Sequence, residues 1–190
     1  MNKRKFDAAL FDVDGTVLNT NEYIFQAYKY TIGLHLKREV TREEVAQVVG
    51  LPFKDCYQLL TGLRDVGYLL ECHDEFQCQN LHLVATFPNT LKTLKALAKA
   101  GVAIAAVTTR YGDQLKESLR FAKIDKYFKV ILTPLDVKKP KPDGESVLKA
   151  LAALGIKPPR AVMIGDSPVD IGAGKAANVK TIAALYGFHG

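Results

Sequence analysis

The chain has 190 residues, of which 48% are hydrophobic and 24% are charged, and its formal net charge is +6. These values are typical of a globular protein with one main core and room for a small accessory unit. No run approaches the roughly 18 apolar residues of a membrane helix, and the basic N-terminus lacks the apolar region of a signal peptide. We therefore expect a cytoplasmic protein with no membrane contact. Because the basic residues do not cluster with aromatic ones, we expect no nucleic-acid partner either.

Short apolar segments predict five buried strands, at residues 6–13, 102–107, 130–132, 161–164 and 181–185. Amphipathic patterns predict helices between them, at residues 89–100, 114–122, 146–154 and 168–177. Strands that are apolar along their whole length are typical of a parallel sheet covered on both faces. The alternation therefore predicts an α/β fold with a doubly wound, Rossmann-like parallel sheet.

A run of helical segments interrupts this alternation between the first and second strands. It predicts helices at about residues 22–32, 42–49, 53–60 and 65–81, and Thr41 with Glu44 matches the capping-box pattern at the second helix. We therefore predict an α/β core made of residues 1–19 and 86–190. The inserted residues 20–85 are predicted to form an all-helical cap subdomain.

Two acidic residues follow the first predicted strand. Asp12 and Asp14 are two positions apart, and Gly15 permits a tight turn directly after them. Ligands of open parallel sheets bind at the carboxyl ends of the strands. Two carboxylates there repel each other unless a cation or a proton offsets their charge. Taken alone, the pattern also fits an ordinary Asp-Gly turn.

Three further signals lie where later strands end. Thr108 and Thr109 offer hydroxyl and backbone N–H groups to an anion, although they also fit a strand-end cap. Lys139 directly precedes Pro140, and Pro140 and Pro142 hold the backbone extended there. This lysine acts as a point charge for phosphate or is part of a solvated turn. Asp166 and Asp170 add carboxylate oxygens, which suit a hard cation such as Mg²⁺. Together, these signals predict one site that binds phosphate and a metal ion.

Four segments in order, FDVDGTVLNT, VTTR, KKPKPD and IGDSPVDI, resemble the four motifs of the haloacid dehalogenase superfamily. The resemblance spans essentially the whole chain, and the helical insertion is similar to the cap that this family carries after its first motif. It favours the branch of phosphoglycolate phosphatases and pyrophosphatases. It implies a Mg²⁺-dependent phosphatase for a small phosphorylated metabolite, such as phosphoglycolate, pyrophosphate, a nucleotide or a sugar phosphate.

The resemblance also implies roles for individual residues. Asp12 would be the nucleophile that forms an aspartyl-phosphate, and Asp14 would be the general acid and base. Mg²⁺ would be held by Asp12, the Asp14 backbone carbonyl and Asp166, with Asp170 as a further ligand. Substrate binding would fall to Thr16, Thr108, Thr109 and Lys139. Thr109 departs from the family pattern, which usually has Asn there, but a backbone contact survives that change.

Other functions stay open at this point. A phosphomutase similar to β-phosphoglucomutase is the nearest rival, but Thr16 and Ile24 stand where that branch typically has Val and His. A non-catalytic binding protein is a more distant alternative. Lys54, in a cap loop at residues 50–54, either meets the leaving group or is a solvated surface lysine. The oligomeric state is either a monomer or a homodimer.

The cysteines raise one further possibility. The chain has three of them and no secretory signal, so we expect no disulfide framework. Cys72, His73, Cys78 and His82 lie close together in the sequence, but their spacing differs from that of structural zinc sites. We expect partly buried residues of a helix instead.

Overall fold

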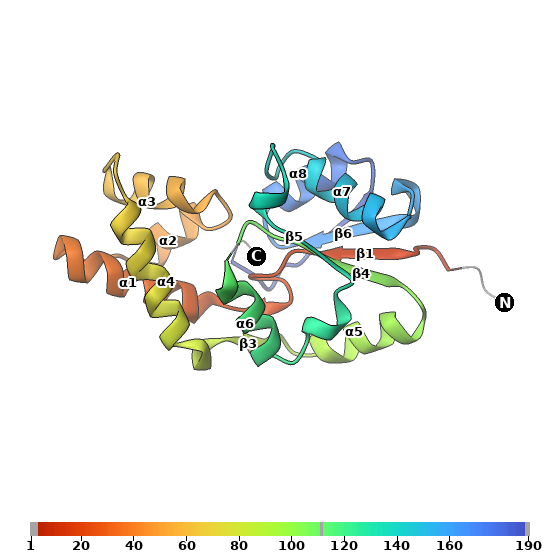
Figure 1. Cartoon of the computed structure of the whole chain (residues 1–190), viewed down its shortest axis with the longest axis horizontal. Coiled ribbons are helices and arrows are strands. Elements are labelled where there is room, and N and C mark those ends of the chain that lie inside the picture. The colour runs from red at the N-terminus through yellow and green to blue at the C-terminus, as the bar shows by residue number, and fades with distance from the viewer. Residues whose placement is uncertain (1–3, 111, 189–190) are drawn as a thin grey trace.

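The computed structural model describes residues 4–110 and 112–188. Five strands form one parallel sheet in the order β5-β4-β1-β6-β7, as predicted for a doubly wound fold (Figure 1). These strands are β1 (Ala8–Phe11), β4 (Ala103–Val107), β5 (Val130–Leu132), β6 (Ala161–Gly165) and β7 (Lys180–Ala183). In the register of the central strand, Ala8 of β1 lies opposite Ala103 of β4 and Ala161 of β6.

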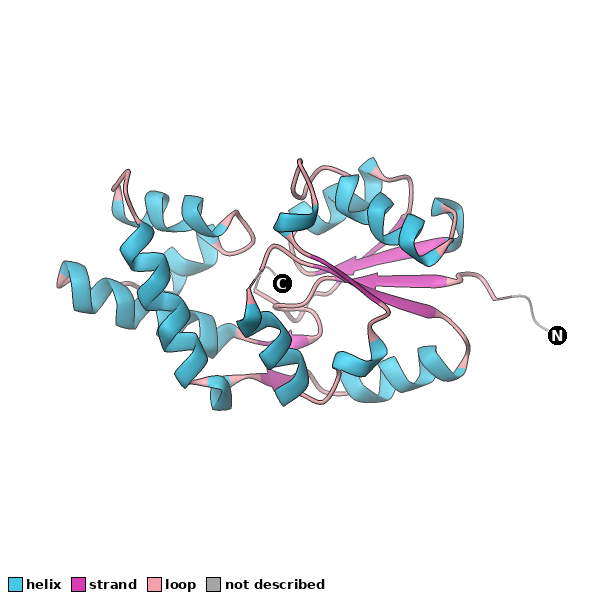
Figure 2. Ribbon diagram, viewed as in Figure 1, coloured by secondary structure: helices cyan, strands magenta, loops and turns pink. Residues whose placement is uncertain are grey.

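Helices cover both faces of the sheet, as Figure 2 shows. One face carries α5 (Thr90–Lys99) and α6 (Asp113–Phe121), and the other carries α7 (Glu145–Leu154) and α8 (Pro168–Ala176). Alternate residues of β1 point to opposite faces. Ala9 and Phe11 therefore join the core under α5 and α6, while Ala8 and Leu10 join the core under α7 and α8. Full burial of β1 explains why its sequence is apolar throughout.

The segment between β1 and β4 folds into four helices, which we call the helical insertion (residues 20–85). They are α1 (Asn21–Leu36), α2 (Arg42–Val48), α3 (Phe53–Thr61) and α4 (Gly67–Gln79). The predicted capping box is present at α2, where Thr41 accepts the Glu44 N–H and the Glu44 side chain accepts the Thr41 N–H. Short 3₁₀ turns complete the chain at Leu81–Leu83, Asp125–Tyr127, Pro134–Asp136 and Pro158–Arg160.

A two-stranded antiparallel ribbon joins the insertion to the sheet domain. Its strands are β2 (Leu18–Asn19) and β3 (Ala85–Thr86), with Leu18 opposite Thr86 and Asn19 opposite Ala85. The sequence analysis did not anticipate this pair. Asn19 and Ala85 lie next to the predicted boundaries, and the division into a core of residues 1–19 and 86–190 and a cap of residues 20–85 stays a prediction.

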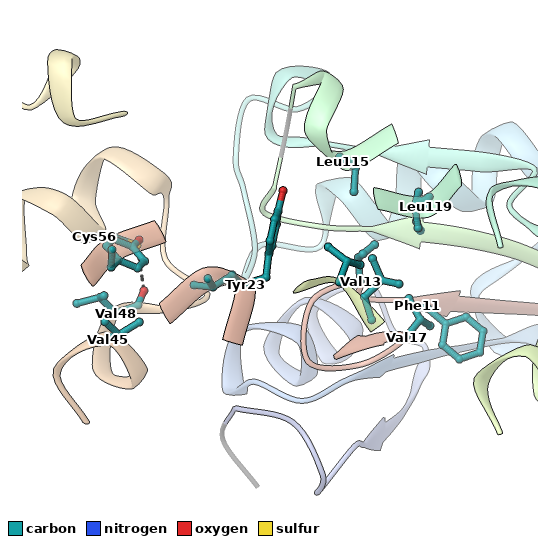
Figure 3. Packing of buried hydrophobic residues seen from close by; sticks show 14 of the residues in the cluster. Phe11, Val13, Val17, Tyr23, Val45, Val48, Cys56, Leu115 and Leu119 are labelled. Carbon is teal, nitrogen blue, oxygen red and sulfur yellow. Dashed lines mark hydrogen bonds between the residues drawn. The ribbon is translucent and has the colours of Figure 1, made fainter. Parts of the chain in front are cut away.

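One hydrophobic cluster runs from the sheet into the insertion. Figure 3 shows Leu115 and Leu119 of α6 near Val13 and Phe11, while Val45, Val48 and Cys56 group together inside the insertion. In the same cluster, Tyr23 of α1 is fully buried. Among the described residues, no helix is both long and apolar enough to cross a membrane.

The last strand differs from its prediction. The structure places β7 at Lys180–Ala183, whereas the apolar pattern favoured residues 181–185. Leu185 lies in a turn beyond the strand and is 78% exposed. A strand at the edge of a sheet pairs with one neighbouring strand only. The run of apolar residues in its sequence therefore need not begin and end where the strand does.

Candidate active site

Four of the predicted site residues meet at the carboxyl end of the sheet. Asp12 directly follows β1, and its backbone N–H donates to the Ile164 carbonyl of β6 at 2.8 Å. The side chain of Asp12 is buried because neighbouring strands flank it on both sides. Asp12, Asp14, Thr109 and Asp166 line one small hollow, which we call the phosphoryl hollow. Its remaining lining residues are Lys141, Ser167, Val169 and Phe188, with Val49 and Gly50 from the insertion.

Lys141, and not Lys139, is the lysine in this hollow. Its side chain is 3% exposed, and its Nζ lies 2.7 Å from Asp12 Oδ1. The same ammonium donates to Asp170 Oδ1 at 2.5 Å and to the Val107 carbonyl at 3.1 Å. Lys139, the lysine that the sequence analysis selected, is exposed and lines a separate surface hollow, so the structure does not bring it together with Asp12.

The local fold explains which lysine turns inward. The carboxylate of Glu145, at the start of α7, accepts the backbone N–H groups of Lys138 and Lys139 and holds them at the surface. A turn follows, in which the Asp143 N–H donates to the Pro140 carbonyl. The chain within this turn carries Lys141 toward the sheet.

Burial and charge act in opposite directions on this ion pair. Burial raises the pKa of Asp12 well above its usual value, Lys141 opposes that rise, and the Asp170 carboxylate adds to it. Burial alone would lower the pKa of Lys141, but Asp12 and Asp170 raise it above its usual value. The lysine therefore stays an ammonium at neutral pH and favours the ionised form of Asp12.

Asp170 is fully buried, and both of its carboxylate oxygens have partners. Oδ1 accepts from Lys141, while Oδ2 accepts the Ser167 backbone N–H at 3.1 Å and the Ser167 hydroxyl at 2.5 Å. Ser167 and Asp170 form the capping box that begins α8. These contacts support a role for Asp170 in orienting Lys141, and its role as a metal ligand stays a prediction.

The acidic residues of the hollow fit a divalent cation. Single carboxylate oxygens of Asp12, Asp166 and Asp170 lie within 4.8 Å of one another. Asp12 and Asp170 share the Lys141 ammonium, and a divalent cation would add further positive charge among the three carboxylates. Oxygen ligands are those that Mg²⁺ prefers. The donor set thus fits the metal that the family resemblance implies.

A C-terminal turn fixes Asp166, and the sequence analysis missed it. The Phe188 backbone N–H donates to Asp166 Oδ2 at 2.7 Å, and the Tyr186 hydroxyl donates to the Thr16 carbonyl at 3.0 Å. Gly187 and Gly15 both pack against the Asp166 side chain so closely that a Cβ on either would overlap it. Gly15 also has a φ of +79°, which favours glycine. No sequence pattern links this turn to Asp166, because the two segments meet only in the folded chain.

The three predicted substrate-binding threonines differ in position: one lines the phosphoryl hollow, and two are buried. Thr109 lines the phosphoryl hollow, whereas Thr108 is buried and its Oγ1 accepts the Arg110 N–H at 3.0 Å. Thr16 is buried, and its hydroxyl lies 3.5 Å from Asp166 Oδ1. Thr16 therefore contacts a carboxylate of the hollow, which does not test its predicted contact with substrate.

Arg110 is a second charged residue that the sequence analysis did not select. Its Nη1 pairs with Asp14 Oδ1 at 3.1 Å, and the two side chains are 12% and 14% exposed. Its Nη2 donates to Ser118 Oγ at 2.6 Å and to the Gln114 carbonyl at 3.0 Å, with the Tyr23 hydroxyl at 3.4 Å. The arginine stands directly after the two threonines, so its position was a signal that the analysis overlooked.

Comparison with known proteins identifies the family. The model of the family "Haloacid dehalogenase-like hydrolase" matches residues 9–184. The chain belongs to this family. The chain is 34% identical to the pyrophosphatase PpaX of Bacillus velezensis over 100% of this chain and 88% of that protein. PpaX of Anoxybacillus flavithermus is 33% identical over 95% of this chain and 84% of its own length.

Solved structures agree with the fold of a haloacid dehalogenase-like hydrolase. The crystal structure of a predicted phosphoglycolate phosphatase from Haemophilus somnus superimposes with a TM-score of 0.92 at 21% identity. It covers 98% of this chain and 88% of that one. The α/β sheet with an inserted helical segment is thus the architecture of the family, and the relatives make this chain a hydrolase of the phosphatase type.

A second hollow in this haloacid dehalogenase-like hydrolase lies between the insertion and the sheet domain, and we call it the insertion cleft. It shares Asp14, Val49, Gly50 and Thr109 with the phosphoryl hollow. Its other lining residues are Ile24, Tyr28, Leu51, Phe53, Cys56, His73, Asp74, Gln77 and Arg110. Three residues of the predicted 50–54 loop therefore line it, whereas Lys54 is exposed and lies outside its walls.

The residues weighed as a zinc site do not gather. Cys78 is exposed, while His73 is buried and its Nδ1 lies 2.8 Å from the Tyr57 hydroxyl. Within residues 4–110 and 112–188, the only group of three or more side chains able to hold a metal ion is the acidic one of the phosphoryl hollow. The expectation of partly buried helix residues holds for Cys72.

Proposed function

We propose that this protein is a Mg²⁺-dependent phosphatase that hydrolyses a small phosphorylated metabolite through an aspartyl-phosphate on Asp12. The proposal rests on one observation: Asp12, Asp14, Lys141 and Asp166 converge in a single hollow at the carboxyl end of the sheet. The names of the related pyrophosphatases agree with phosphoryl chemistry. The insertion closes one side of the hollow through Val49 and Gly50, which supports a small substrate.

In the first step, a carboxylate oxygen of Asp12 attacks phosphorus and the bond from phosphorus to the leaving oxygen breaks. Asp14 gives its proton to that oxygen. Lys141 holds Asp12 in position through Oδ1 and helps to keep it ionised before attack. Asp170 orients the lysine in turn.

In the second step, Asp14 takes a proton from a water molecule that attacks the aspartyl-phosphate. The bond between phosphorus and the Asp12 oxygen breaks, which releases phosphate and restores the carboxylate. Asp12 and Asp166, with the Asp14 backbone carbonyl, are the groups that would hold Mg²⁺. When bound, this ion offsets the repulsion between the anionic substrate and the carboxylates.

The test measures phosphate release from p-nitrophenyl phosphate, with and without Mg²⁺, for the wild type and for Asp12→Asn. Asp125→Asn serves as the control, because Asp125 is exposed and lies outside the hollow. We expect Mg²⁺-dependent turnover in the wild type and in the control, and background release in Asp12→Asn. Mass spectrometry after an acid quench should find a phosphoryl group on the peptide that contains Asp12. Full activity of Asp12→Asn would overturn the proposal.

A further inference from the structure

Arg110 contacts the proposed acid, Asp14, at the place where the two hollows meet. The arginine follows Thr108 and Thr109 beyond the end of β4 and lines the insertion cleft, whereas Asp14 lines both hollows. In the proposed function, Asp14 gives a proton to the leaving oxygen and later takes one from water. The contacts that hold its carboxyl group therefore decide whether that group reaches those oxygens.

The guanidinium of Arg110 is fixed by contacts other than the one with Asp14. Its Nη2 donates to the Ser118 hydroxyl at 2.6 Å and to the Gln114 carbonyl at 3.0 Å, both in α6. Its central carbon lies 5.2 Å from the ring centroid of Tyr23. A planar fork that is held through one nitrogen presents the other in a set direction. That other nitrogen, Nη1, lies 3.1 Å from Asp14 Oδ1.

Tyr23 ties this arrangement to the helical insertion. It is fully buried in α1, and its hydroxyl donates to the Gln77 carbonyl of α4 at 3.0 Å. The same hydroxyl lies 3.4 Å from Nη2 of Arg110. Burial raises the pKa of Tyr23 to about 12, so the phenol is neutral at physiological pH. Arg110 is thus held jointly by α6 of the sheet domain and by α1 of the insertion.

One donor of the fork has no acceptor. The Nε of Arg110 is buried and makes no hydrogen bond to any residue in the described ranges. A buried N–H without an acceptor costs free energy. The contacts of Nη1 and Nη2 hold the arginine in this position despite that cost. Local rules of this kind are typically broken where function sets the conformation.

We infer, on the basis of the proposed function, that Arg110 is the positioning residue for Asp14. A guanidinium only donates hydrogen bonds, so the oxygen that it holds, Oδ1, is an acceptor in both steps. Oδ2 is then the oxygen that gives its proton to the leaving oxygen and takes one from the attacking water. Because the carboxyl group is planar, fixing Oδ1 also restricts where Oδ2 can lie.

The dependence of the rate on the leaving group tests this role. Phenyl phosphate and p-nitrophenyl phosphate have similar shapes, but phenolate is the more basic leaving group and depends more on a proton from Asp14. In Arg110→Met, kcat/KM with Mg²⁺ should fall by about 30-fold for phenyl phosphate and by less than about threefold for p-nitrophenyl phosphate. Arg120→Met, at an exposed position of α6, should leave both values unchanged.

A second variant separates positioning from direct contact with substrate. Ser118 is fully buried and is not among the residues that line either hollow, but its hydroxyl holds Nη2 of Arg110. Ser118→Ala should therefore lower kcat/KM for phenyl phosphate by about fivefold and leave p-nitrophenyl phosphate unchanged. Adding Arg110→Met to Asp14→Asn should cause no further loss on either substrate, because the arginine then has no acid to position.

Circular dichroism confirms that each variant is folded, and Ser118→Ala decides the matter if Arg110→Met is not. Equal losses on the two substrates, wild-type rates in the folded variants, or a further loss in the double variant would overturn the inference. Each of these outcomes leaves the proposed function intact. A folded wild type that turns over neither aryl phosphate with Mg²⁺, or an Asp14→Asn variant with wild-type rates on phenyl phosphate, would overturn the proposed function and the inference together.

Discussion

Lys141 lies between two buried carboxylates, and its three ammonium protons are directed to Asp12, Asp170 and the Val107 carbonyl. Each of these buried charges is stable only while its partners of opposite charge are present. Removing the lysine leaves two buried acids that repel each other, and an unpaired buried charge costs far more than a surface charge. Lys139, two positions earlier, has no such partners and sits at the surface.

This contrast predicts different outcomes for two equivalent substitutions. Lys141→Met should lower the free energy of unfolding by about 3–5 kcal/mol and phosphatase activity by about 100-fold or more. Lys139→Met should change the free energy of unfolding by less than about 0.5 kcal/mol and leave activity near that of the wild type. Urea unfolding and phosphate release measure the two effects. Equal losses in both variants would contradict the assignment of Lys141.

His73 predicts a loss of stability in mild acid. Its pKa falls from 6.5 to about 3 on folding, so the unfolded chain binds an extra proton between these values. The stabilising contribution is thus complete above pH 6.5 and is lost as the pH falls toward 3. Between pH 8 and pH 5 the loss should be about 2 kcal/mol, measurable by urea unfolding. In His73→Asn the pH dependence should shrink by that amount, and an unchanged dependence would contradict the prediction.

Sequence reasoning located the acidic residues but selected Lys139, whereas the structure places Lys141 beside Asp12. Asp12 and Asp166 follow apolar strands directly, so their place at the sheet edge could be read from the sequence. Lys139 and Lys141 occupy one short motif with similar neighbours, and only the contacts of Glu145 and the turn at Pro140 separate them. Phe188 reaches Asp166 from a distant segment, which no local pattern records. Arg110 directly follows the two threonines, and that signal was overlooked.

At the scale of elements, the helices were easier to predict than the ribbon. The eight α-helices of residues 4–110 and 112–188 all overlap their predicted ranges, because local apolar patterns and caps mark helices in the sequence. β2 and β3 contain two residues each and lie 65 or more positions apart, too short to produce a pattern. Their pairing depends on the insertion folding back on itself.

Two capping boxes permit a matched experiment on helix ends. Ser167→Ala at α8 and Thr41→Ala at α2 each remove one N-cap side chain, so each should lower the free energy of unfolding by about 1 kcal/mol. Only Ser167 also binds Asp170, the partner of Lys141. Ser167→Ala should therefore lower activity several-fold more than Thr41→Ala. Equal activities would show that α8 does not set the position of Lys141.

At the scale of the whole molecule, the acidic hollow links metal binding to stability. Repulsion among three carboxylates that lie this close together destabilises the folded chain, and a bound divalent cation would relieve it. Mg²⁺ at about 100 times its Kd should add about 2.7 kcal/mol and raise the melting temperature by about 5–10 °C. Asp166→Asn should abolish most of this Mg²⁺-dependent rise in melting temperature. The melting temperature measured in NaCl, without Mg²⁺, should be unaffected by the substitution. Thermal melts with and without Mg²⁺ decide the question, and an undiminished rise in the variant would contradict the proposed metal site.

The ribbon has a consequence for how this architecture changes over evolutionary time. Asn19 and Ala85 lie opposite each other in an antiparallel pair, so the two ends of a 65-residue excursion meet as closely as the two ends of a hairpin turn. An excursion anchored in this way can be exchanged, lengthened or trimmed between those two positions without altering the strand order beneath it. The aspartates at the sheet edge and the residues of the insertion are thereby free to diversify as separate modules of one gene.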